Sequence, residues 1–397
     1  MGVCVGLALV CACDGITLNV LDGPGACVSI GNMNAQAARS TDEFVNSIGL
    51  KPLGLDSSDP RLTESIATLG IRHIILREDW MGAINALDLR GLVTIEDLAD
   101  ASPALAFFGA RAEAITFRDN NPVIDAAWGA NIRSTQQQLF ASVKGNPATR
   151  DVIVAGPNIG SDAQIAAAGD LSAWADVGTF FPWRTELWRA PPGLRAETDI
   201  ARHIPVYGQL PLIAPQTGYD TASDKGVTEA VQAKYVVRML LEHFRLGVPR
   251  TFIADLADQG PPAPGMLSEG IGLLHADGSP KPAFAALTRT IALLADPGPV
   301  FVPGRLALTL SPASPTVHQL LLQKRNGVFY LLLWREVESV DADVTEPVVV
   351  NLPTPAKTLT LFSPLYGAAP LAQGQGHTFV LDVPDSLAVL VIESACR

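Results

Sequence analysis

Short apolar runs rich in strand-forming residues alternate with stretches of helical periodicity from about Thr41 onward. Because a parallel sheet is built from strands that each lead into a helix, this alternation predicts repeated βα units. Eight strands are expected, at Ser47–Leu50, Ile71–Leu76, Leu105–Gly109, Val123–Trp128, Asp151–Ala155, Val177–Phe181, Leu210–Ala214 and Thr251–Asp255. Eight such units predict a (β/α)8 TIM barrel, a fold of the α/β class.

Two stretches between these strands carry the clearest helical pattern. In Ser134–Lys144 and Thr228–Leu246 the apolar residues recur at three- and four-residue spacing. That spacing places them on one face of a helix, as a helix packed on a barrel requires.

The pattern changes after Pro297-Gly298-Pro299, where strand-like runs follow one another without a long helical stretch. These runs are Leu306–Leu310, Val317–Lys324, Val328–Trp334, Val348–Leu352, Thr358–Phe362, His377–Val380 and Leu387–Ile392. Asn326-Gly327 is a two-residue hairpin signal, since both residues tolerate positive φ. Residues 298–397 are therefore expected to form an antiparallel β-sandwich, which either stabilises the barrel or binds sugar.

The length of 397 residues suits one barrel of about 250 residues and one smaller domain. We expect the barrel over 41–297, the sandwich over 298–397, and a separate N-terminal segment over 1–40. The apolar run Val3–Cys13 is either part of a secretion signal or a strand that pairs with the sandwich. Secretion or a cell-surface location is the preferred interpretation, and no later segment is apolar enough for a membrane span.

Composition excludes some classes of function. With 48% hydrophobic and 17% charged residues the chain is globular, and a net charge of -12 argues against nucleic acid as a partner. Five cysteines lack the spacing of a zinc site, although a disulfide between the N-terminal segment and Cys396 is open. We expect no cofactor and no metal.

One stretch carries a specific motif. Pro211–Ala222 reads PLIAPQTGYDTA, and with Gly270–Phe284 it resembles the retaining (β/α)8 glycoside hydrolases of the β-xylosidase and endoglycosidase kind. In that superfamily the acid/base follows strand four and the nucleophile follows strand seven, in a motif similar to TETGY. The resemblance implies that Gln216 stands where the nucleophilic glutamate would be.

The acid/base motif of the family looks like EGPNE. The resemblance aligns it with Trp128-Gly-Ala-Asn-Ile132, so that Ile132 replaces the acid. A competing stretch, Gly156-Pro-Asn-Ile-Gly160, follows the predicted fifth strand and is interpreted as structural.

Retaining hydrolysis needs two carboxyl groups about 5–5.5 Å apart, one to attack the anomeric carbon and one to protonate the leaving oxygen. Isoleucine does neither, and glutamine has no anionic oxygen with which to form the glycosyl-enzyme. We therefore expect a catalytically inactive, glycoside-hydrolase-like protein that binds carbohydrate or serves as a structural or assembly subunit.

Other side chains are expected near the same end of the barrel. Leu53 and Phe181 stand where the resemblance implies polar sugar contacts after strands one and six. Aromatic and amide side chains that would line a sugar site are Asn131, Trp128, Trp183 and Tyr219. A glycan and a protein assembly partner are thus both candidate partners.

The alternative is an active glycosidase with a relocated carboxylate pair. Glu78 and Asp220 follow predicted strands, Asp255 ends one, and these three are the candidates for it. Acids at strand ends also commonly cap helices or pair with arginine, as Asp79 or Asp255 would with Arg77 or Arg250.

Overall fold

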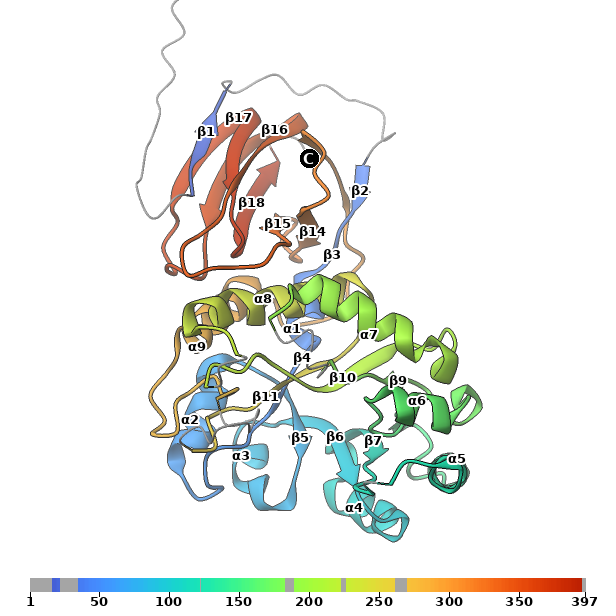
Figure 1. Ribbon diagram of the computed structural model, residues 1–397. Coiled ribbons are helices and arrows are strands. Elements are labelled where there is room, and N and C mark those ends of the chain that lie inside the picture. Colours follow the sequence, from blue (N-terminus) through green and yellow to red (C-terminus); the bar gives the residue numbers. More distant parts are fainter. Residues whose placement is uncertain are drawn as a thin grey trace, which may run out of the picture. The chain divides into compact units, whose positions relative to one another are not determined.

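The computed structural model describes residues 16–21, 35–121, 123–182, 189–222, 226–260 and 270–394 (Figure 1). Contacts within the chain group it into two compact units. One comprises residues 46–227 and 242–281, and the other comprises 1–45, 228–241 and 282–397.

The first unit contains an eight-stranded parallel sheet in the order β8-β7-β6-β5-β4-β11-β10-β9. Its strands are β4 (Ile48–Lys51), β5 (His73–Leu76), β6 (Arg90–Ile95), β7 (Ala112–Phe117), β8 (Ile153–Val154), β9 (Gly178–Thr179), β10 (Leu212–Thr217) and β11 (Thr251–Ala254). A parallel bridge between Ala155 and Val177 joins the two end strands. The predicted TIM barrel is therefore confirmed.

Helices separate the strands along the chain (Figure 1). They are α2 (Pro60–Leu69), α3 (Met81–Ala86), α4 (Ala101–Phe108), α5 (Ala126–Gly145), α6 (Asp162–Ala168) and α7 (Pro192–Tyr207). Local sequence sets their ends: the Asp59 side chain caps α2, and Gly70 closes it at φ 72°. A capping box of Ser161 and Gln164 starts α6.

Two of the eight predicted strands were wrong. Leu105–Gly109 falls mainly in helix α4, and Val123–Trp128 leads into helix α5, where the Asp125 side chain caps the first turn. Strands three and four are instead β6 and β7. Leu105–Gly109 is apolar throughout, and such a run fits a buried helix as well as a buried strand. In Val123–Trp128 the pattern was taken for a strand because Asp125 was not recognised as a helix cap.

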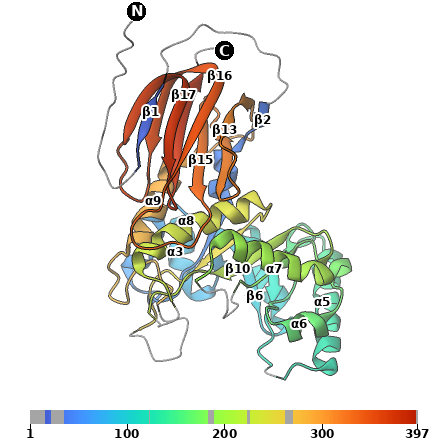
Figure 2. The same ribbon diagram turned by 45° about the horizontal axis from the view of Figure 1, so that its top comes forward.

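The second unit is built on an antiparallel sheet in the order β1-β17-β16-β18-β15-β14-β3, with β13 paired to β16. Its strands are β1 (Leu18–Val20), β3 (Arg39–Ser40), β13 (Thr309–Ser311), β14 (Val317–Gln323), β15 (Phe329–Arg335), β16 (Glu346–Phe362), β17 (Ala372–Val383) and β18 (Ala388–Ser394). Figure 2 shows β17 beside β16 in this sheet. The hairpin at Asn326-Gly327 is confirmed, but of these two residues only Gly327 has a positive φ, of 88°. The β-domain that follows the barrel is also confirmed.

Short N-terminal strands belong to this second unit. β1 pairs with β17, and β3 pairs with β14 in parallel. A separate two-stranded sheet joins β2 (Ala35–Ala37) to β12 (Arg305–Ala307). The run Val3–Cys13 and all five cysteines lie outside the described residues, so the signal and the disulfide stay predictions.

A buried ion cluster links helix α8 (Glu229–Arg245) to the β-domain within the second unit. The Lys234 ammonium lies 3.0 Å from carboxylate oxygens of both Asp343 and Asp385, and all three side chains are at most 1% exposed. Lys234 also donates to the backbone carbonyls of Val340 and Ala342. Because an ammonium must be fully paired when it is removed from water, this cluster fixes the helix in place.

Two more α-helices complete the described fold: α1 (Thr41–Asn46) and α9 (Pro282–Leu294). Among the described helices, none is long and apolar enough to span a bilayer.

Candidate functional site

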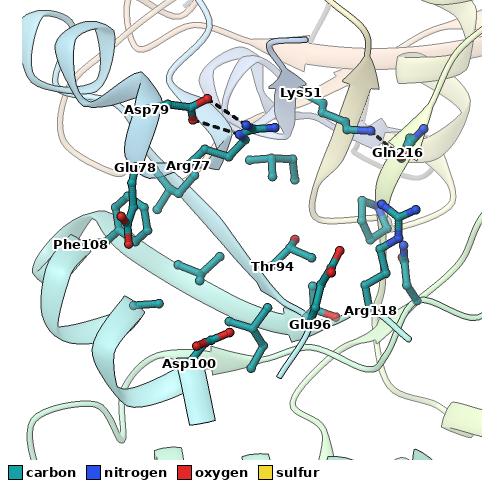
Figure 3. A pocket seen from close by; sticks show the side chains of 18 of the residues that line it. Lys51, Arg77, Glu78, Asp79, Thr94, Glu96, Asp100, Phe108, Arg118 and Gln216 are labelled. Carbon is teal, nitrogen blue, oxygen red and sulfur yellow. Dashed lines mark hydrogen bonds and ion pairs between the residues drawn. The ribbon is translucent and has the colours of Figure 1, made fainter. Parts of the chain in front are cut away.

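A cavity of about 820 Å³ opens at the carboxyl ends of the barrel strands, which we call the large cavity (Figure 3). Seven consecutive strands each bring a side chain to it from their carboxyl end: Lys51, Arg77, Glu96, Arg118, Asn158, Phe181 and Gln216. This is the face on which TIM-barrel enzymes build their sites, since the loops there vary without disturbing the barrel. The cavity is therefore the candidate site.

Lys51 and Gln216 meet on one side of the large cavity. The Lys51 ammonium donates a hydrogen bond of 2.9 Å to Gln216 Oε1 and lies 4.0 Å from Asp255 Oδ1. Burial lowers the pKa of Lys51, an effect that Asp255 opposes and that Arg118 and Arg77 reinforce. Burial also raises the pKa of Asp255, against the opposing charge of Lys51.

Arg118 comes from the residue after β7 and is exposed in the cavity. Within the described ranges its side chain makes no recorded hydrogen bond or ion pair. Arg77, by contrast, is held by Asp79 through two hydrogen bonds of 3.0 and 2.8 Å. Arg118 is thus available for a ligand.

Acidic side chains occupy other parts of the wall. In Figure 3, Glu78 and Asp100 lie across the cavity from Lys51 and Gln216, and Glu96 lies nearer to Arg118. No hydrogen bond or ion pair is recorded for these three carboxylates among the described residues. The large cavity therefore presents unused acceptors as well as an unused cation.

A second cavity of about 300 Å³ adjoins the first and shares Glu96 and Arg118 with it. We call it the side cavity. It is lined by residues that follow β7 and by Asn131 and Thr135 of α5.

Four of the residues selected from the sequence reach these cavities. Gln216, Phe181 and Glu78 line the large cavity, and Asn131 lines the side cavity. Their role in binding or catalysis stays a prediction.

The other selected residues lie elsewhere. Ile132 and Trp128 are buried inside α5, and neither lines a cavity described above. Tyr219 is also buried, and its hydroxyl donates to the Ala190 carbonyl. Leu53 lies outside the lining of both cavities. Trp183 lies outside the described residues.

The two aspartates proposed for a relocated pair do not line the large cavity. Asp255 is 1% exposed and contacts Lys51 and Gln259, not Arg250. Asp220 is 9% exposed, and its Oδ1 accepts from a backbone N–H. The expected pairing of Asp79 with Arg77 is confirmed.

Sequence reasoning missed Lys51, Arg118 and Glu96. Glu96 and Arg118 directly follow β6 and β7, the two strands that were misassigned, so they were never considered as strand-end residues. The run Leu-Val-Thr-Ile before Glu96 carried a usable β-branched signal.

No protein-family model and no curated protein matches the chain. Solved structures do match over most of its length. A family 39 glycoside hydrolase from the gut symbiont Bacteroides cellulosilyticus WH2 aligns with a TM-score of 0.61 and 14% identity, over 89% of this chain and 82% of that one.

Two further solved structures have a similar fold over most of their length. A glucosidase from Croceicoccus marinus gives a TM-score of 0.59 at 11% identity, over 90% of this chain and 96% of that chain. A GH51 arabinofuranosidase from Xanthomonas axonopodis pv. citri gives 0.56 at 12% identity, over 91% and 98%. The chain therefore has the fold of the TIM-barrel glycoside hydrolases with a β-rich C-terminal domain; at such identity the likeness establishes the fold alone.

Proposed function

We propose that this protein binds a glycan in the large cavity and does not hydrolyse it by the retaining mechanism. The observation that carries the proposal is the pair formed by Gln216 and Lys51 at the carboxyl end of β10, the seventh barrel strand. An uncharged amide bound to an ammonium stands where the resemblance places a nucleophilic carboxylate.

This pair is unsuited to retaining chemistry for two physical reasons. The Gln216 amide has no anionic oxygen to attack an anomeric carbon. The transition state of glycoside hydrolysis also carries positive charge on the sugar, and the Lys51 ammonium 2.9 Å from Gln216 Oε1 would repel it. Lys51 therefore raises the barrier that a carboxylate would lower.

The lining of the large cavity supports binding. Its volume of about 820 Å³ falls in the range that holds small ligands, about 300–1,000 Å³. Phe181 and Phe108 offer apolar surface, and the buried Oδ1 of Asn158 has no hydrogen-bond partner among the described residues. A sugar hydroxyl that donates to Asn158 would satisfy that atom.

The structural neighbours support sugars as the ligand class to test first. Three of them are named as a glycoside hydrolase, a glucosidase and an arabinofuranosidase. These names describe the activities of those proteins, and sugar binding by this chain is our proposal.

A second candidate function is hydrolysis by a different carboxylate pair. Glu78, Glu96 and Asp100 all line the large cavity, and no partner is recorded for their side chains in the described part of the chain. One of them as acid and another as base would give an enzyme that does not use Gln216.

A secreted or cell-surface location belongs to the same proposal. It is supported by the apolar run Val3–Cys13, and N-terminal sequencing of the mature protein from its native cells tests it. A chain that still begins at Met1 would contradict a cleaved signal.

The test of function is hydrolysis of a panel of aryl glycosides by the purified chain, with sugar binding followed calorimetrically in the same samples. We expect binding without turnover above that of a Gln216→Ala variant. Turnover that Glu78→Gln or Glu96→Gln abolishes, and that Gln216→Ala leaves intact, would establish the second candidate.

A further inference from the structure

The side cavity extends the candidate site beyond the large cavity. Its volume of about 300 Å³ lies at the lower end of the range for a ligand pocket, so alone it suits one part of a ligand. Glu96 and Arg118 line both cavities and stand at their junction. A ligand made of linked units and bound in the large cavity would extend into the side cavity.

Besides Glu96, which follows β6, the walls of the side cavity come mainly from two parts of the barrel unit. The segment after β7 contributes Asn120 and Asn121, and helix α5 contributes Asn131 and Thr135. Asn131 and Thr135 are four residues apart and thus lie on one helix face. Ile132, next to Asn131, is buried in the core instead. The helix therefore directs a polar face to the cavity.

Three polar side chains of this wall are available for a ligand. Within the described ranges no hydrogen bond is recorded for the side chains of Asn120, Asn131 and Thr135, and all three are at least partly exposed. Amides and hydroxyls both donate and accept, which matches the hydroxyl groups of a sugar.

The charges of the two cavities favour an uncharged ligand. Three cationic residues line the large cavity, but Arg77 is neutralised by Asp79, and Glu78, Glu96 and Asp100 add negative charge. The side cavity contains Arg118 with Glu96 and Asp119. Neither lining is predominantly cationic, and the whole chain carries a net charge of -12, so a polyanion would be repelled.

We propose that the side cavity is a subsite for the next residues of a neutral oligosaccharide whose first residue occupies the large cavity. Asn131 and Thr135 hold the extension, and Arg118 and Glu96 contact the sugar at the junction. The inference rests on the proposed glycan binding and adds the ligand class: an uncharged chain of sugars, in preference to a monosaccharide or an acidic glycan.

The experiment is a calorimetric titration of the full chain with two series of neutral sugars, gluco- and arabino-oligosaccharides from one to five units. We expect affinity in one series to rise at least tenfold between the monosaccharide and the trisaccharide. An Asn131→Ala/Thr135→Ala double variant should lose that gain and keep the affinity for the monosaccharide. Gln137→Ala, exposed on the same helix and outside both linings, is the matched control.

Each result separates the subsite from glycan binding as such. Equal affinity for all lengths, or a gain that the double variant retains, overturns the subsite and leaves glycan binding intact. Tighter binding of an acidic series, oligogalacturonides, overturns the neutral class. Absence of binding to every sugar by the wild-type chain overturns the proposed function and the subsite with it.

Discussion

Replacing Lys51 by methionine tests the charge arrangement at the centre of the site. The substitution removes the hydrogen bond to Gln216 and leaves Asp255, which is 1% exposed, without its cation. Two charges 4.0 Å apart attract by about 4 kcal/mol at an effective dielectric constant of about 20. Removing one partner of a buried pair costs about 3–5 kcal/mol. Because the Lys51 side chain is 20% exposed, we expect a loss of about 3 kcal/mol in the free energy of unfolding at pH 7.5.

The loss of stability caused by Lys51→Met should become smaller as the pH is lowered. Burial raises the pKa of Asp255, and loss of Lys51 raises it further. A carboxyl group with a raised folded pKa destabilises the fold as pH rises through that pKa. The Lys51→Met deficit should therefore shrink when the pH is lowered from 7.5 to 5, as Asp255 takes up a proton.

Urea unfolding followed by circular dichroism measures both effects. The double variant Lys51→Met/Asp255→Asn should recover at least half of the lost free energy, because it buries no unpaired charge. A single-variant loss below about 0.5 kcal/mol, or a double variant no more stable than Lys51→Met, would refute the reasoning.

Three other substitutions test the packing within the two units. Gly129→Ala should lower the free energy of unfolding by about 1–3 kcal/mol in urea, because its Cβ would lie 2.0 Å from a backbone oxygen of α6. Gly145→Ala on the same helix is the control: its Cβ meets nothing within 4 Å, so it should not destabilise the protein. Burial lowers the pKa of His243 to about 3, so its neutral form stabilises the fold above about pH 6.5 and this contribution is lost as the pH falls. The melting temperature of His243→Gln should therefore fall less steeply than that of the wild type between pH 6.5 and 4.5. Equal slopes for the two proteins would contradict this prediction. Lys234→Met should cost about 3–5 kcal/mol by leaving two buried aspartates unpaired, and a cost under 1 kcal/mol would show that the cluster is not tightly coupled.

The sequence predicted the architecture because the two periodicities it contains are strong. Thr228–Leu246 became α8, and the hairpin at Asn326-Gly327 formed where its turn residues stand. The prediction failed at α4. Ala101–Phe108 is apolar on most of its surface, so its sequence shows no helical pattern that would distinguish it from a strand.

Prediction of the site depended on those strand assignments. Gln216 could be located because a local motif marks β10 independently of its neighbours. Ile132 was selected through the misassigned fourth strand, and it lies buried in α5. Lys51 could not have been paired with Gln216 from sequence, because their contact joins residues 165 positions apart.

The central claim is that the large cavity binds a glycan and leaves it intact. The most direct measurement is a calorimetric titration with a neutral oligosaccharide labelled at its reducing end, after which the sugar is recovered and chromatographed. The account predicts saturable binding and recovery of the full-length sugar. Release of shorter labelled products in proportion to the protein, or no heat of binding with any oligosaccharide, would contradict it.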